Sequence, residues 1–139
     1  MEVSLATKPK AEQTGLALIR MLTGILMAYH GWEVFDSAKM AEYASWDVVQ
    51  TLPAPKLMVY MGKGLELVTG VFFILGLFTR ITALLMAVNM LFICFRIGNG
   101  RFYFEDQHPF LFAVLALVFF FTGPGKWSID HLRFKQDRD

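Results

Sequence analysis

The chain is poor in the residues that carry thiol and redox chemistry. Its 139 residues include one cysteine, Cys94, and the sequence has no motif for haem attachment, an iron–sulfur cluster or a nucleotide. A dithiol–disulfide relay needs two thiols, so it cannot operate within a single chain. A lone thiol within an apolar helix is typical of inert packing. Any part in electron transfer would therefore depend on a bound small molecule or on a partner that carries the cofactor.

Net charge is also low, because 13 lysines and arginines balance 12 acidic residues. A charge of +1 argues against a nucleic-acid-binding surface, which needs a basic patch. What the chain has instead is apolar residues, at 55% of the total with a mean hydropathy of +0.46. Soluble domains usually have about 45–50%. The composition therefore indicates a membrane protein that contacts the lipid bilayer.

Four apolar runs cover residues 15–35, 57–79, 81–97 and 106–123. A transmembrane helix needs roughly 20 apolar residues, with about 17 as the lower limit. Segments such as "VFFILGLF" are apolar on every side, whereas a soluble helix has one apolar stripe. The runs predict an all-α, integral membrane four-helix bundle that forms a single domain over residues 1–139. We expect its polar tail, residues 124–139, to be partly ordered at most.

The distribution of lysine and arginine predicts the topology, because these residues gather in cytoplasmic loops. Four spans place both termini on one side, with seven basic residues: Lys8, Lys10, Arg80, Lys126, Arg133, Lys135 and Arg138. The opposite side has three: Lys39, Lys56 and Arg101. We therefore expect a multi-pass protein of the bacterial inner membrane with both termini in the cytoplasm. The 36–56 segment would face outward, as a short helix on the membrane surface or as an ordinary loop.

Several polar residues interrupt the runs, and each charged one costs about 2.5–3.5 kcal/mol at a helix centre. From a rise of about 1.5 Å per residue, they all fall in the outer half of the membrane. They are His30, Glu33, Lys63, Glu66, Asn89, Arg96 and His108. Charged groups in hydrocarbon turn toward the interior and pair. We therefore predict a polar cavity that opens outward and has its floor near Glu66 and Asn89.

Spacing predicts which of these side chains meet. His30 and Glu33, like Lys63 and Glu66, are three residues apart and share a helix face. The expected pairs are Lys63 with Glu66 or Glu33, Arg96 with Glu33, and His30 with Glu66. The cluster would bind a ligand or handle protons, with Tyr29, Trp32 and Phe110 stacking beside it.

Two other interpretations of the cluster stay open. An internal ion-pair network can lock helices together without any ligand. Metal binding by His30, Glu33 and His108 is a weaker alternative, because their spacing matches no recognised metal signature. Outside the cluster, we expect Arg20 to extend to the membrane surface. Glycines in the first two runs are expected at close helix contacts. No complete catalytic constellation is visible, which argues against independent catalysis.

Three stretches resemble the DoxX family of small bacterial membrane proteins: "YHGWEVF" (29–35), "GLELVTGVFFILGLFTRITALLMAVNML" (64–91) and "HPFLFAVLALVFFFTGPGKWSID" (108–130). The resemblance implies a compact four-helix membrane fold and a link to redox or oxidative-stress systems. The family is named after a subunit associated with archaeal thiosulfate:quinone oxidoreductase. The family-like positions are His30, Gly31, Glu66, Gly70, Gly76, Thr79, Arg80, Asn89 and Gly123–Gly125.

The leading hypothesis is a small-molecule- or quinone-binding subunit of a membrane redox assembly, with a redox enzyme as partner. Glu66 would accept or relay a proton, His30 would bind the ligand and Lys63 would hold the counter-charge. A scaffold that docks a partner protein is the alternative. A small-solute transporter is the third hypothesis. Four helices are few for alternating access, so a transporter would require a homo-oligomer.

Overall fold

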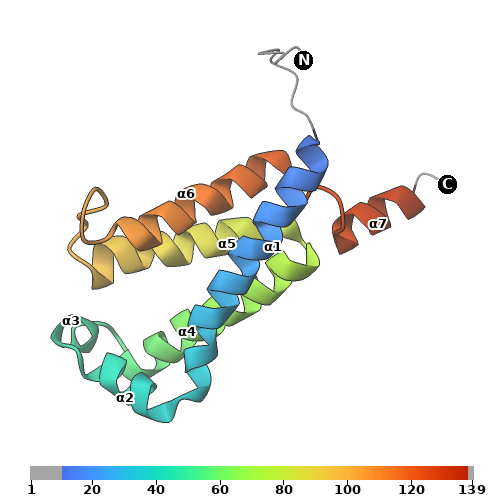
Figure 1. The fold of residues 1–139 in the computed structure, drawn as a ribbon. Coiled ribbons are helices and arrows are strands. Elements are labelled where there is room, and N and C mark those ends of the chain that lie inside the picture. Colours follow the sequence, from blue (N-terminus) through green and yellow to red (C-terminus); the bar gives the residue numbers. More distant parts are fainter. Residues whose placement is uncertain (1–10, 138–139) are drawn as a thin grey trace.

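Residues 11–137 are described by the computed structural model, and every regular element within them is a helix. Four long helices dominate: α1 (Glu12–Gly31), α4 (Pro55–Leu75), α5 (Thr79–Phe92) and α6 (Gln107–Thr122). Helix α1 packs mainly on α4, α4 on α5, and α5 on α6. Figure 1 shows α5 and α6 running alongside each other, with α1 crossing over them toward α2. The all-helical prediction is confirmed for the described residues.

Short helices occupy the connection between α1 and α4. The 3-10 helix η1 (Trp32–Phe35) continues α1 and is followed by α2 (Ser37–Ser45) and α3 (Asp47–Gln50). The 36–56 segment is therefore mostly helical, as one of the two expectations had it. Asp36 caps α2, because its carboxylate accepts hydrogen bonds from the Ala38 and Lys39 N–H groups. Figure 1 shows α2 and α3 beside the beginning of α4.

Two helical segments are long and apolar enough to cross a membrane, Pro55–Leu75 and Thr79–Ile97, and the apolar Gln107–Thr122 is shorter. The second apolar run was predicted to extend to residue 79, but α4 ends at Leu75. Gly76 ends it with a left-handed φ of 65°, which glycine adopts without steric cost. The third segment finishes in a π-helical turn, η2 (Ile93–Ile97).

Helices α1 and α4 meet backbone to backbone through glycines. A Cβ atom on Gly31 would lie 2.2 Å from the Leu67 nitrogen, and one on Gly70 would lie 2.4 Å from the Ala28 nitrogen. No side chain fits at these positions, so the expected small-residue contact is present. Gly62 and Gly64 differ, because a Cβ at either would meet nothing closer than 3.9 Å.

The C-terminal tail was expected to be partly ordered at most, and its described part, residues 124–137, forms a turn and a helix. Helix α7 (Ile129–Gln136) follows a turn that docks on the rest of the protein. The Asp130 carboxylate accepts hydrogen bonds from the Phe78 and Thr79 N–H groups at 2.8 and 2.7 Å. These bonds satisfy free N–H groups at the start of α5, and they fix α7 beside the α4–α5 turn.

Arg20 binds the same segment from the interior of the protein. The prediction that its side chain extends to the membrane surface is therefore wrong. Its side chain is 0% exposed. The guanidinium donates to the backbone oxygens of Phe73 at 2.8 Å and Trp127 at 2.8 Å, and also to those of Pro124 and Lys126. Carbonyl groups left free where α4 ends and α7 begins thus satisfy the buried charge, so the side chain has no need to reach water.

Candidate functional site

A cavity of about 680 Å³ lies against α4 and α5, next to the end of α1 and the beginning of α6. Most of its lining is apolar, and α2 and α3 contribute the side chains at one end. The polar lining residues of the long helices are His30, Lys63, Glu66, Asn89 and His108. Five of the seven polar residues predicted for the cavity therefore line it.

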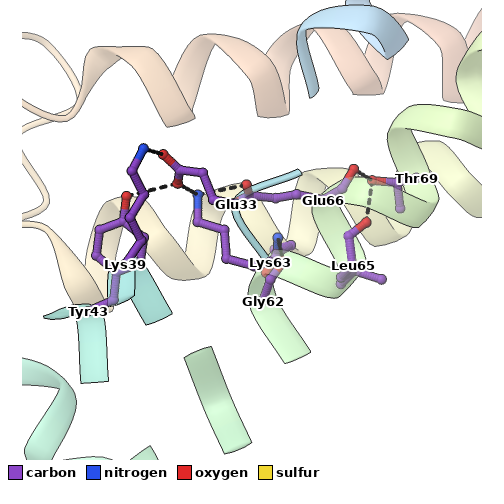
Figure 2. Close-up of polar contacts among 9 residues, drawn as sticks. Glu33, Lys39, Tyr43, Gly62, Lys63, Leu65, Glu66 and Thr69 are labelled. Atoms are coloured by element: carbon purple, nitrogen blue, oxygen red, sulfur yellow. Dashed lines mark hydrogen bonds and ion pairs between the residues drawn. The ribbon is translucent and has the colours of Figure 1, made fainter. Parts of the chain in front are cut away.

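Lys63 is the centre of the charged cluster, which Figure 2 shows in close-up. Its Nζ atom lies 3.0 Å from a Glu33 oxygen and 3.0 Å from a Glu66 oxygen. Both ion pairs predicted for Lys63, the one with Glu33 and the one with Glu66, are thus present. Glu66 is only 4% exposed, and a buried carboxylate depends strongly on such a partner. One ammonium group therefore joins the floor of the cavity to Glu33 at its outer edge.

Helix α2 adds two partners that the sequence did not predict. Tyr43 donates its hydroxyl to Glu33 at 2.8 Å, and Lys39 forms an ion pair with Glu33 at 3.0 Å. Burial, followed by the hydrogen bond to Glu33 and its charge, raises the pKa of Tyr43 to about 12. Tyr43 also lies under Lys63, whose Nζ atom is 5.4 Å from the ring centroid. The tyrosine is thus a neutral donor that ties α2 to the cluster.

On the other side of the cavity, aromatic and amide groups face the cluster. The rings of His30 and His108 are 5.2 Å apart edge to face, and Phe112 lies 5.0 Å from His108. The Asn89 amide donates to the backbone oxygen of Gly62 at 3.3 Å, which links α5 to α4. Within residues 11–137, the predicted His30–Glu66 hydrogen bond is not formed, although both residues line the same cavity.

Four other predicted residues lie elsewhere. Arg96 is exposed and forms no ion pair with Glu33 or any other carboxylate in the described part of the chain. Tyr29 and Trp32 are 77% and 66% exposed and point away from the cavity. Phe110 packs against Phe102 at 5.0 Å and is not among the lining residues. The predicted pocket aromatics are therefore wrong, and the aromatic residues that line the cavity are Tyr43, Trp46, Phe92 and Phe112.

The metal alternative finds no structural support. Over residues 11–137, no three histidine, cysteine or carboxylate side chains lie close enough to hold a metal ion. Glu33 is already bound to Lys39, Tyr43 and Lys63. His30, Glu33 and His108 therefore do not form a ligand set.

Comparison with known protein families identifies the family of the chain. The sequence profile of the DoxX family matches residues 15–99, which is more than half of the chain. The chain belongs to the DoxX family. The matched region begins in α1 and ends just after η2, so it contains every charged member of the cavity cluster.

Two curated relatives extend the similarity beyond that region. An uncharacterized protein of Haemophilus influenzae is 27% identical over 128 residues, covering 87% of this chain and 92% of the relative. A protein of Bacillus subtilis named putative oxidoreductase CatD is 24% identical over 127 residues, covering 91% and 92%. No solved structure shows significant similarity to the chain.

The contacts of α2 are the part of this DoxX site that the sequence did not predict. Tyr43 and Lys39 lie ten and six residues from Glu33, in a segment that the sequence predicted only as a surface helix or a loop. A signal was present in Asp36, which is a favoured N-cap residue ahead of a short helix. Such a helix turns the chain back over the end of α1 and brings Tyr43 to Glu33.

Proposed function

We propose that this DoxX protein crosses the bacterial inner membrane four times as a helix bundle. Two observations support the proposal. Large aliphatic side chains such as Leu22, Ile25 and Leu111 are exposed on the outer faces of α1 and α6, where water would disfavour them. Exposed aromatic residues gather toward both ends of the helices, including Trp32 before α2 and Trp127 before α7. Such aromatics favour the two membrane–water interfaces.

We further propose that both termini are cytoplasmic and that the cavity lies in the outer half of the membrane. The α4–α5 turn, α7 and the start of α1 share one end of the described structure, and α2 and α3 share the other (Figure 1). Arg80, Lys126, Arg133 and Lys135 lie at the first end, which favours the cytoplasm. Lys8, Lys10 and Arg138, which add to this count, lie outside the described residues.

The cavity supports binding of a small molecule, for which a quinone is our leading candidate. The observation that carries this proposal is the buried Glu66, paired with the half-buried Lys63, in a largely apolar cavity of about 680 Å³. That volume is within the roughly 300–1,000 Å³ of small-molecule sites, which combine apolar walls with a few convergent polar groups. Glu66 would accept or relay a proton, His30 would bind the ligand and Lys63 would balance the charge.

A role in a membrane redox assembly follows from the same site, with catalysis residing in a partner. Within the described residues no thiol pair or metal cluster offers a redox centre. The name of the Bacillus relative, a putative oxidoreductase, supports a redox context. The bound molecule would carry the electrons, and the DoxX protein would hold it and exchange its proton.

A scaffold function is the second candidate, and one observation favours it. Glu33, Lys63 and Glu66 satisfy one another within the protein, so the cluster could act as an internal frame that joins η1 to α4. A scaffold predicts that the cluster matters for stability and not for any ligand.

Mass spectrometry of the lipid extracted from purified protein distinguishes the ligand-binding function from the scaffold function. We expect a stoichiometric quinone or other small molecule in the wild type and its loss, by at least tenfold, in Glu66→Gln. Glu105→Gln, a matched change in the exposed 98–106 loop, controls for handling. If Glu66→Gln retains the bound species, or if the wild type contains none, the ligand proposal is refuted. Thermal unfolding of each variant shows whether loss of ligand is merely loss of fold.

Orientation is tested independently by membrane-impermeant thiol labelling in a Cys94→Ser background. Glu42→Cys in α2 is expected to react in intact cells, whereas Lys135→Cys in α7 is expected to react only after the cells are broken. Equal labelling of the two from outside would refute the proposed topology.

A further inference from the structure

We propose that the ligand enters the cavity sideways from the bilayer, between α4 and α5. The ligand is then a lipid-dissolved amphiphile whose neutral, hydrogen-bond-donating head meets Glu66 and Asn89. This inference rests on the proposed ligand-binding function and names the class of molecule and its route. We refer to the gap lined by Met61, Val68, Leu85 and Val88 as the α4–α5 groove.

The residues of the α4–α5 groove line the cavity and are also exposed at the outer surface of the protein. Met61 and Val68 on α4, like Leu85 and Val88 on α5, line the cavity. All four are also exposed at the surface of the protein. In a membrane these side chains would contact hydrocarbon. The cavity is thereby continuous with the bilayer at this position.

Packing closes parts of two other sides of the cavity. On the α1 side, Gly31 and Gly70 bring the backbones of α1 and α4 into direct contact. At the α2–α3 end, Val49 and Leu52 line the cavity and are buried, whereas Trp46 beside them is 44% exposed, so these short helices cover the cavity in part. The sequence had predicted an outward opening, and the partial cover at that end leaves the α4–α5 groove as an apolar route into the cavity.

The floor of the cavity offers hydrogen-bond acceptors from two helices. Lys63 occupies one oxygen of Glu66, and the other oxygen makes no hydrogen bond to the described residues. The Asn89 amide nitrogen donates to Gly62, which leaves the Asn89 amide oxygen to accept. A ligand hydroxyl between α4 and α5 can donate its single hydrogen to either oxygen.

Charge restricts the head further. Lys39 and Lys63 balance Glu33 and Glu66, so an anionic head would enter a largely apolar cavity without a free counter-charge. A hydroxylated ring, such as the reduced form of a quinone, meets the requirement. A hydrocarbon chain attached to such a ring continues into the groove.

The test uses Trp46, which lines the cavity. In a Trp32→Phe/Trp127→Phe background it is the one remaining tryptophan, and a bromine atom on a bound ring quenches its fluorescence. The full chain is placed in lipid nanodiscs at pH 6.5 and titrated with 2-bromo-4-dodecylphenol. The chainless 2-bromo-4-methylphenol tests the need for a chain, and 2-bromo-5-dodecylbenzoate tests an anionic head.

Groove variants then test the route. We expect Val88→Phe and Val68→Phe to raise the concentration of dodecylphenol needed for half-quenching at least fivefold, with less than a twofold change for the chainless phenol. Val71→Phe on α4 and Val118→Phe on α6 are matched controls, because both residues are exposed but do not line the cavity. We expect both controls to match the parent protein and the benzoate to quench at least fivefold more weakly.

Each contrary result overturns a defined part of the proposal. Groove variants that match their controls overturn sideways entry, even if Glu66→Gln still abolishes quenching and the proposed function stands. A benzoate that quenches as well as the phenol overturns the assigned head chemistry. If no phenol quenches Trp46 while mass spectrometry finds a bound molecule, this inference falls alone. If no bound molecule is found either, the proposed function falls as well.

Discussion

Replacing Lys63 with methionine removes the ammonium group shared by Glu33 and Glu66 while keeping most of the apolar volume. At the observed 3.0 Å, the attraction between Lys63 and Glu66 is worth about 5–6 kcal/mol at an effective dielectric constant near 20. Removing one partner of a buried pair typically costs about 3–5 kcal/mol. Because Glu66 is almost completely buried, we expect Lys63→Met to lower the free energy of unfolding by about that amount.

The double variant Lys63→Met/Glu66→Gln is the informative comparison. It removes the charge that Lys63→Met leaves uncompensated, so we expect it to recover at least half of the lost stability. Glu66→Gln alone leaves Lys63 paired with Glu33, and we expect it to cost only about 1 kcal/mol.

The assay is reversible unfolding of the purified protein in mixed micelles, followed by circular dichroism. Lys39→Met removes a lysine that also pairs with Glu33 but is exposed, so it is a matched control with an expected effect under about 1 kcal/mol. A double variant no more stable than Lys63→Met would refute the electrostatic reasoning.

Three further predictions concern packing, the C-terminal segment and pH. Gly70→Ala should destabilise the protein by about 1–3 kcal/mol, because its methyl group would overlap the α1 backbone; chemical unfolding measures this. Arg20→Met should speed tryptic cleavage of the 126–135 segment severalfold, because the buried carbonyls that bind the guanidinium lose their donor. Tyr43 should ionise near pH 12, by absorbance at 295 nm compared with Tyr43→Phe. Since its pKa is raised above the ordinary value near 10, its contribution to stability is complete below pH 10 and disappears between pH 10 and about 12.

Each of these predictions has its own check. Gly64→Ala is the control for Gly70→Ala, because open space surrounds it, and equal effects would contradict the packing argument. Unchanged proteolysis in Arg20→Met would mean that α7 is held mainly by other contacts. A tyrosine titration identical to that of Tyr43→Phe above pH 11 would contradict the hydrogen bond to Glu33.

Local spacing was enough to predict much of the helical structure and the centre of the site. The one-turn separation of Lys63 and Glu66 predicts their contact within α4. Because a charge within the membrane needs a partner, Glu33 was also expected to pair with Lys63. The same geometry should have excluded Tyr29 and Trp32. Each precedes a cluster residue by one position, which is a rotation of about 100° around the helix.

What the sequence could not supply depends on irregular winding and on long-range contacts. Arg96 follows Asn89 by seven residues and should share its face in a regular helix. The π-helical turn at Ile93–Ile97 adds residues to the turn and rotates Arg96 away from the cavity. The burial of Arg20 depends on carbonyl groups more than 100 positions along the chain, which no local pattern reveals.

A lysine held between two carboxylates can release one of them and remain neutralised by the other. The arrangement Glu33–Lys63–Glu66 therefore lets Glu66 turn to a guest, or take up its hydrogen ion, without stranding a cation in hydrocarbon. Under the proposed function, the occupied and empty forms of the chamber would exchange by small side-chain movements, because Gly31 and Gly70 keep the backbones of α1 and α4 in direct contact.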